Sequence, residues 1–352
     1  MGLLDLGVLV ALQRQPNPAR YFKLVALTAC VLLALVSTCT FLASDDLYFG
    51  SQFMAIGTLA HGLFLHAPAL LILCGWLLRK EARRLALGSL SLGLVTVGVG
   101  VYAFWIEPTN LKLSKHQVHS AKLEAPLRLV VLSDLQLERL GEHEKRAIRL
   151  ALAQDPDVLL MPGDFIHTKP GAEYQGLVKE LNAFLHSVDF GARLGAIAVG
   201  GNVERDGWEG IFEGLPVDCF ASSGSVRWGG VHFQALEFRD SGWRELRLEE
   251  SEGFGVVVGH KPDFALGEIP ADLLVAGHTH GGQVVLPFLG PPITLTQVPR
   301  DWASGRTETR EGQTLIVSRG VGMERGYAPR LRFLCPPEIV VIDLLPLGTK
   351  RR

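Results

Sequence analysis

The most constraining feature of this chain is a set of short apolar runs, each of which ends at a polar side chain able to bind a metal ion. Glycine or polar residues bound the runs, which is typical of strands buried on both faces of a sheet. Side chains at the carboxyl ends of parallel strands meet at one edge of the sheet, where open α/β sheets place their binding sites. The runs are LVVLSDLQ (Asp134, Gln136), VLLMPGD (Asp164), AIAVGGN (Asn202), FGVVVGH (His260) and LLVAGHTH (His278, His280).

These side chains form a mixed donor set of carboxylates, amides and imidazoles. Such a set suits Zn, Mn or Fe better than Ca²⁺, which prefers oxygen donors, or ions that prefer thiolates. The sequence therefore predicts a metal-dependent hydrolase that holds two metal ions at the edge of a sheet.

The first third of the chain contains three apolar segments long enough to cross a bilayer, which needs about 20 residues. They are residues 24–43, 53–78 and 85–106, and none contains Asp, Glu, Lys or Arg. A buried core helix would explain one such segment, but three in succession with short polar loops favour membrane spans. A cleaved signal peptide is an alternative for the first, although no A-x-A site follows it, which favours an uncleaved anchor.

The distribution of charge around these segments predicts their orientation. Cations flank the cytoplasmic side of membrane spans, so residues 1–23 and the second loop are expected in the cytoplasm. The third span then leads out of the cytoplasm, so the residues after Ile106 are expected on the outer, periplasmic face of an inner membrane. The cations are Arg14, Arg20 and Lys23 before the first span and Arg79, Lys80, Arg83 and Arg84 in the second loop, while Asp45 and Asp46 occupy the first loop.

After a polar linker at residues 107–122, residues 123–352 alternate between strand and helix patterns. Two helices are expected, one over residues 142–154 and one marked by apolar residues at helical spacing from 177 to 188. Cys219 and Cys335 form either one disulfide or two buried thiols. The net charge of −2, from 34 basic and 36 acidic residues, gives no indication of a nucleic-acid partner. Further strands are expected at 128–133, 231–238, 243–248, 314–318 and 339–344.

The order of the motifs resembles that of the calcineurin-like metallophosphoesterases. The segments GHTHGGQVVLP at 277–287 and VSRGVG…RLRFLCPPEIVVIDL at 317–344 are similar to a membrane-anchored bacterial branch of that family, the YkuE and YaeI-like proteins. The resemblance implies an α/β fold in which N-terminal transmembrane helices precede a four-layer αββα sandwich with two mixed sheets at 123–352.

The resemblance also implies two divalent ions, Mn, Zn or Fe, bridged by Asp164. In the family, hydroxide held between the ions attacks phosphorus in a phosphodiester, pyrophosphate or phosphomonoester. The catalytic centre would contain Asp164, Asn202 and His278. The ligands that complete the first site would be Asp134, Gln136 and His280, and those of the second Asn202, His260 and His278.

Two positions depart from the family pattern. Gln136 stands where the family usually has His, so it either coordinates through its amide oxygen or only hydrogen-bonds, with the loss of one ion. Val203 replaces the histidine of the family's GNH motif and cannot protonate a leaving group. General acid catalysis contributes typically about 10²–10⁴-fold, so its loss favours substrates with good leaving groups. His143 or His167 could substitute for it, or each could be an ordinary packing histidine.

The sequence allows more than one role for several other residues and for the chain as a whole. Glu204, Arg205, Ser318 and Arg319 either contact an anionic substrate or serve the fold. Membrane anchoring makes a lipid-linked phosphate ester an attractive substrate, although anchored enzymes also act on soluble esters. The chain could instead be a degenerate family member that binds a phosphorylated ligand with little turnover, or a membrane scaffold. Six retained ligands at one sheet edge disfavour the scaffold, and the sequence does not determine the oligomeric state.

Overall fold

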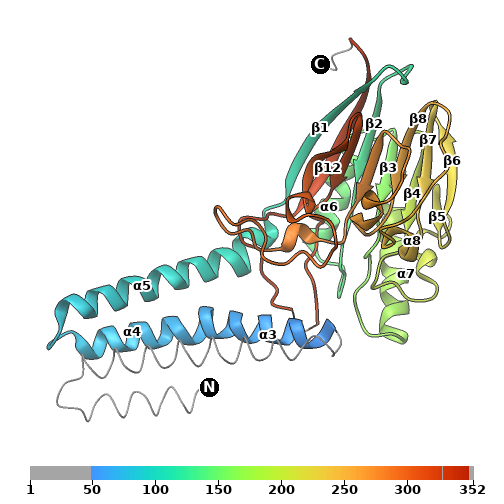
Figure 1. The fold of residues 1–352 in the computed structure, drawn as a ribbon. Coiled ribbons are helices and arrows are strands. Elements are labelled where there is room, and N and C mark those ends of the chain that lie inside the picture. The colour runs from blue at the N-terminus through green and yellow to red at the C-terminus, as the bar shows by residue number, and fades with distance from the viewer. Residues whose placement is uncertain (1–48, 327, 349–352) are drawn as a thin grey trace. The chain divides into compact units, whose positions relative to one another are not determined.

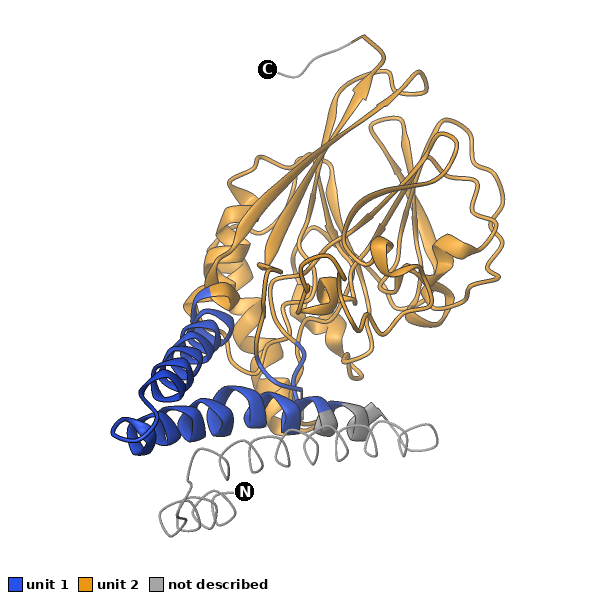
Figure 2. Ribbon diagram, turned by 60° about the vertical axis from the view of Figure 1, so that its left-hand side comes forward, with its two compact units in different colours: residues 1–106, 324–330 blue, residues 107–323, 331–352 orange. Residues whose placement is uncertain are grey.

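The structure is a computed structural model that describes residues 49–326 and 328–348. The chain divides into two compact units, one of residues 1–106 with 324–330 and the other of residues 107–323 with 331–352 (Figure 2). The expected cytoplasmic segment at 1–23 and the first expected membrane span at 24–43 lie outside the described residues.

The first unit contains two apolar helical segments, Ile56–Leu78 and Arg83–Thr109, which are long and apolar enough to cross a membrane. Only 22% of the most apolar stretch of each is buried, so neither packs like the core helix of a water-soluble domain. The two segments overlap the spans expected at 53–78 and 85–106, although the first begins three residues later than expected. The helical elements are α3 (Phe49–His61), the π-helical turn η1 (Gly62–His66), α4 (Ala67–Leu78), α5 (Arg83–Val101) and the π-helical turn η2 (Tyr102–Ile106).

Small residues let α4 and α5 approach each other closely. A Cβ atom added at Gly75 would lie 2.6 Å from Leu90 Cγ, and one added at Gly93 would lie 2.8 Å from Ile72 Cγ1. Helices that pack inside a membrane use glycine in the same way, because close backbone approach replaces the missing hydrophobic drive.

The second unit is built on two mixed six-stranded sheets, as expected (Figure 1). In the first sheet β12 runs antiparallel to β2, while in the second the antiparallel strands are the two edges, β6 and β10. The first sheet has the order β1 (Lys112–Ser120), β12 (Glu338–Pro346), β2 (Leu127–Val131), β3 (Val158–Met161), β4 (Gly195–Val199) and β5 (Val217–Phe220). The second has the order β10 (Gly305–Arg310), β11 (Gln313–Val317), β9 (Leu273–Ala276), β8 (Phe254–Val258), β7 (Val231–Ala235) and β6 (Gly224–Trp228).

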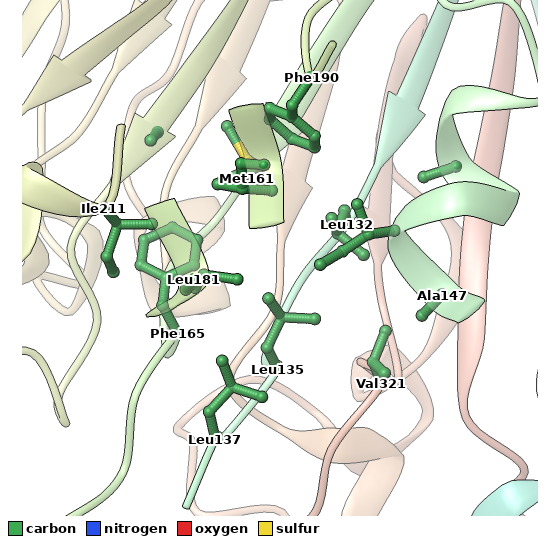
Figure 3. Close-up of a cluster of buried hydrophobic side chains, with 14 of the residues drawn as sticks. Leu132, Leu135, Leu137, Ala147, Met161, Phe165, Leu181, Phe190, Ile211 and Val321 are labelled. Atoms are coloured by element: carbon green, nitrogen blue, oxygen red, sulfur yellow. The ribbon is translucent and has the colours of Figure 1, made fainter. Parts of the chain in front are cut away.

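Two apolar cores hold the first sheet in place. One fills the space between the sheets, where side chains of β2, β3 and β12 pack against those of β7, β8 and β9. The other lies between the first sheet and its helices α6 (Glu142–Leu152), α7 (Ala172–Ser187) and η4 (Trp208–Phe212), and includes Phe165, Leu181 and Phe190 (Figure 3). The two expected helices are therefore confirmed, with the apolar stripe of α7 facing this core.

The outer face of the second sheet differs from the expected fourth layer of helices. It is covered by loops and by two very short elements, α8 (Phe238–Ser241) and η5 (Pro262–Leu266), around a small core that includes Phe264 and Leu246. Gly267 ends η5 with an extended backbone, and a Cβ atom there would lie 2.2 Å from Leu246 O, so glycine allows this close contact. The remaining short turns are η3 (Glu107–Thr109), η6 (His280–Gly282) and η7 (Arg300–Trp302).

Two expectations about strands were wrong. Residues 107–122 are not only a linker, because β1 lies within them and pairs in parallel with β12 from Lys112 to Ser120. Val118 is the only buried residue of this edge strand, so its sequence carries no apolar run. Residues 243–248 form no strand and contribute only one isolated bridge, from Arg247 to Glu268. The other expected strands are present with ends shifted by a few residues, and Cys219 and Cys335 are free thiols.

Candidate metal centre

The candidate site lies where the carboxyl ends of strands from both sheets meet. All five apolar runs that the sequence singles out are strands, and the polar residue follows each of them. Asp134, Asp164 and Asn202 follow β2, β3 and β4 of the first sheet. His260 and His278 follow β8 and β9 of the second sheet, so neither sheet alone could assemble the group.

One cluster joins Asp164, His260 and His278, whose ligand atoms all lie within 4.8 Å of one another. The Nε2 atom of His260 lies 3.4 Å from Asp164 Oδ1, 3.1 Å from His278 Nδ1 and 3.1 Å from Asn202 Oδ1. The first three side chains are buried, whereas Asn202 is exposed.

The far nitrogens of the two histidines decide what faces the centre of this cluster. His260 Nδ1 contacts Pro162 O at 2.6 Å, and His278 Nε2 contacts Leu295 O at 3.2 Å. A carbonyl oxygen accepts only, so in each ring that nitrogen carries the proton and the other presents a lone pair. Two imidazole lone pairs therefore converge with oxygen atoms of Asp164 and Asn202 and no proton between them, and this donor set fits a divalent cation.

A second cluster joins Asp134, Asp164 and His280, whose ligand atoms also lie within 4.8 Å of one another. His280 Nε2 is 3.9 Å from Asp134 Oδ1. The Asp134 carboxylate accepts hydrogen bonds from Ser133 Oγ and from the backbone N–H of His278, the latter at 3.0 Å. Because Asp164 belongs to both clusters, its carboxylate is positioned to bridge two cations.

The side-chain amide of Gln136 directs its nitrogen, and not its oxygen, toward this second cluster. Its Nε2 donates to Asp164 Oδ2 at 2.6 Å and lies 3.4 Å from His280 Nε2. Its Oε1 is turned away and lies 2.6 Å from His167 Nδ1. The structure thus brings Gln136 to the expected place, but in this orientation the amide donates a hydrogen bond and offers no oxygen to a cation.

The backbone around the site is unusual in a way that the sequence does not reveal. Left-handed φ angles cost non-glycine residues roughly 1 kcal/mol each, and such strain concentrates at functional sites. Glycines surround the site closely: a Cβ atom at Gly201 would lie 2.2 Å from Asp164 Oδ1, and one at Gly320 would lie 2.6 Å from Asp134 Cβ. The residues with a left-handed backbone are Asp134, Gln136, Asp164, His278 and His280.

Burial sets the protonation of the buried side chains. It lowers the pKa of His278 to about 4 and holds the pKa of His260 well below its usual value, so both rings are neutral near pH 7. It raises the pKa of Asp134 to about 7. A cation would reverse this last effect, since metal binding requires the deprotonated carboxylate.

Val203 and Glu204, which follow Asn202, form hydrogen bonds that hold the neighbouring loops together. The N–H of Val203 donates to Asp164 Oδ1 at 3.2 Å, while its side chain is buried. The Glu204 carboxylate accepts from Gly201 N, from Asp164 N at 3.0 Å and from Phe165 N at 2.6 Å. Burial raises the pKa of Glu204 above its usual value, and these N–H donors offset only part of that rise. Glu204 therefore joins the loops that carry Asp164 and Asn202, while Arg205 is exposed.

The two histidines considered as replacements for the missing proton donor make other contacts. His143 Nε2 lies 3.3 Å from Val321 O, and His167 Nδ1 faces Gln136. Arg319 pairs with Glu338, and Ser318 Oγ accepts from Gly320 N, so these two residues hold the loop after β11. These contacts favour a role in the fold for Ser318 and Arg319 over contact with an anionic substrate.

Arg332 belongs to the site's framework, although sequence analysis assigned it no role. Its side chain is fully buried, and burial lowers its pKa. The guanidinium donates to backbone carbonyl oxygens, and it thereby joins the His280 turn to the loop after β11. The only sequence signal was its place inside the motif RLRFLCPPE. Its acceptors are the carbonyl oxygens of His280, Arg319, Gly320, Gly322 and Cys335.

Comparison with known proteins agrees with this architecture. A family model described as calcineurin-like phosphoesterase matches residues 127–282. The chain is also 30% identical over 298 residues to the uncharacterized metallophosphoesterase YkuE of Bacillus subtilis, an alignment that covers 76% of this chain and 99% of YkuE. The chain belongs to the calcineurin-like metallophosphoesterases. It is thus an enzyme of a family of hydrolases that act on phosphate esters and use divalent metals.

Two other relatives of this metallophosphoesterase carry more specific names. The phosphodiesterase YaeI of Escherichia coli is 24% identical over 260 residues, which cover 69% of this chain and 92% of YaeI. The UDP-2,3-diacylglucosamine pyrophosphatase LpxG of Chlamydia trachomatis is 33% identical over 102 residues, which cover only 26% of this chain and 29% of LpxG.

Proposed function

We propose that this chain is a membrane-anchored phosphoesterase that holds two divalent ions, Mn, Zn or Fe, and hydrolyses a phosphodiester or pyrophosphate. The observation that carries the proposal is the convergence of imidazole, carboxylate and amide lone pairs at the edge where the carboxyl ends of strands from both sheets meet. Asp164 would bridge the ions. The further ligands would be Asp134, His280 and, if its amide turns, Gln136 at one site and Asn202, His260 and His278 at the other.

When bound, the ions supply a nucleophile at neutral pH and positive charge that stabilises the phosphoryl oxygens. The chain's own residues perform the positioning. Pro162 O and Leu295 O orient the rings of His260 and His278, and the Glu204 carboxylate holds the Asp164 backbone. Asn202 is exposed at the rim, where it would meet the substrate as well as an ion.

The substrate class follows from what the site lacks. Val203 offers no proton to a leaving group, while His143 Nε2 contacts Val321 O and His167 Nδ1 contacts Gln136 Oε1. A leaving group that departs as a stable anion, as in a pyrophosphate or an activated diester, needs that proton least. The names of YaeI, a phosphodiesterase, and LpxG, a pyrophosphatase of a diacylated nucleotide sugar, support the same class and favour a lipid-linked substrate.

The proposed location is the inner membrane, with several spans and the catalytic domain on the periplasmic face. Two apolar helical segments and the cations at residues 79, 80, 83 and 84 support this arrangement. A C-terminal fusion to a reporter that is active only outside the cytoplasm would be active if the orientation is right. A silent fusion alongside an active cytoplasmic reporter would place the domain on the inner face.

The activity can be tested on the full chain purified in mild detergent. We expect metal-dependent hydrolysis of an aryl diester or a lipid pyrophosphate with added Mn²⁺ or Zn²⁺, and little hydrolysis of alkyl monoesters. Asp164→Asn should abolish turnover, whereas Asp206→Asn, an exposed neighbour in the same region, should leave it unchanged. Ligand binding without turnover under all metal conditions would instead identify a degenerate, ligand-binding family member.

A further inference from the structure

A loop next to the candidate metal centre exposes large apolar side chains to solvent. Phe288 is fully exposed, and Leu289 is 75% exposed. Leu286 and Leu334 are also exposed, and we refer to these four side chains as the apolar tip. Soluble surfaces carry scattered apolar residues, but neighbouring exposed Phe and Leu side chains at one loop end indicate an interaction site.

Backbone hydrogen bonds hold the tip in this exposed position. Leu286 and Gly290 exchange two backbone hydrogen bonds, at 3.0 and 2.9 Å. Phe333 is bonded to Val285 and to Gln283, each at 2.9 Å, so the arm of the loop is paired with a second segment. Phe288 itself has a left-handed φ of 68°, a conformation that this turn imposes at some cost. The paired backbone therefore fixes the exposed position of the apolar tip.

Both arms of this loop are attached to the candidate metal centre. The first arm follows directly from His280, through the turn η6. The second arm returns at Leu295, whose carbonyl oxygen contacts His278 Nε2 at 3.2 Å. Whatever binds the tip is thus held at a fixed distance from two of the proposed metal ligands.

We propose that the apolar tip inserts into one leaflet of a lipid bilayer and presents the metal centre to phosphate esters at the membrane surface. This inference rests on the proposed membrane anchoring and phosphoesterase activity. Residues 281–298 contain no Asp, Glu, Lys or Arg, whereas a protein docking site has a polar, charged rim. A loop free of charge enters the acyl region without burying an unpaired ion.

Chain connectivity keeps the domain close to a bilayer. The apolar helical segment ends at Thr109, and β1 begins at Lys112. Two intervening residues span at most about 10 Å, so a domain tethered in this way begins at the membrane surface. A bilayer is therefore available to the tip at all times, which is not true of a soluble partner.

The test uses the full chain in vesicles of phosphatidylethanolamine and phosphatidylglycerol. A photoreactive phenylalanine analogue replaces Phe288 or, as the matched control, Trp243, which is 54% exposed on the same unit. We expect lipid adducts at position 288 in at least about tenfold excess over position 243, since burial of one such side chain is worth about a factor of ten. Equal yields, or an adduct with a second protein chain, would overturn the proposal.

Two further variants distinguish insertion of the apolar tip from the proposed phosphoesterase activity. The adduct at position 288 should also form in Asp164→Asn, which cannot turn over, so a failed activity assay leaves this readout intact. In the active enzyme, the double variant F288S/L289S should lower the rate on an ester embedded in vesicles, relative to the rate on a water-soluble ester, by about 10- to 100-fold. An unchanged ratio of the two rates would contradict insertion of the tip.

Discussion

The side-chain amide of Gln136 donates a hydrogen bond to Asp164 Oδ2 at 2.6 Å, while its oxygen faces His167 Nδ1 at the same distance. A neutral donor therefore lies against the carboxylate that would bridge two cations. His167 stabilises this orientation if its Nδ1 carries the proton, and a turn of the amide would require the other tautomer of the ring. The strength of one proposed metal site would thus depend on His167, which is not among its proposed ligands.

The number of tightly bound ions tests the orientation of Gln136. If the amide keeps its nitrogen toward Asp164, Gln136→Ala should change the affinity for the second ion by less than about threefold, whereas Gln136→His adds a ligand and should tighten it by about 10–100-fold. Titration with Mn²⁺, followed by electron paramagnetic resonance, measures both ions. Gln175→His, on the exposed side of α7, is the control. A tenfold weaker second ion in Gln136→Ala would mean that the amide oxygen coordinates.

Val203→His should restore a proton donor at the position where the family usually carries one. We expect turnover of an alkyl phosphate, a poor leaving group, to rise by about 10²-fold or more, and turnover of a good leaving group to change little. The comparison of kcat for the two substrates measures this effect. Val203→Leu fills the same buried position without an acid and should show no gain. Equal effects of His and Leu would remove the missing-acid explanation.

Arg332→Met should destabilise the domain strongly because several backbone carbonyl oxygens lose the buried guanidinium that donates to them. The expected loss in the free energy of unfolding is about 3–5 kcal/mol, as for other buried charged networks that lose one member. Thermal denaturation in detergent measures it as a lower Tm. Arg247→Ala breaks an exposed ion pair with Glu268 and should cost less than about 1 kcal/mol. Similar shifts in both variants would argue against the framework role of Arg332.

Metal affinity should depend on pH through Asp134. Its pKa of about 7 in the metal-free protein means that the carboxyl is protonated at lower pH and must lose that proton to bind an ion. Affinity for the ion at this site should therefore rise about tenfold per pH unit up to pH 7 and then level off. His278, with a pKa of about 4, is already neutral across this range and adds no further dependence.

Calorimetric titration at several pH values between 5.5 and 8 would measure this dependence together with the released proton. Asp134→Asn should bind the ion more weakly but with an affinity that no longer changes with pH. A wild-type affinity that stays constant over the same range would contradict the assignment of Asp134 as the titrating ligand.

Local patterns in the amino-acid sequence were sufficient to predict several elements of the fold. Five apolar runs, each followed by a donor, predicted five strands and the edge at which their side chains meet, because strand direction and buried position leave that edge as the common end. The same patterns predicted α6, α7 and the two described apolar helical segments. They failed where local pattern is weak or misleading, at the polar edge strand β1 and at residues 243–248.

Which atoms of those residues face one another depends on contacts between segments that are distant in the sequence. The orientation of the Gln136 amide depends on His167 and Asp164, which lie 31 and 28 residues away along the chain. Arg332 and Glu204 gained their roles in the same manner, by meeting backbone groups of distant loops. Hydrogen-bond partners and left-handed backbones at the site arise when separate loops are packed together, and no local sequence period records them.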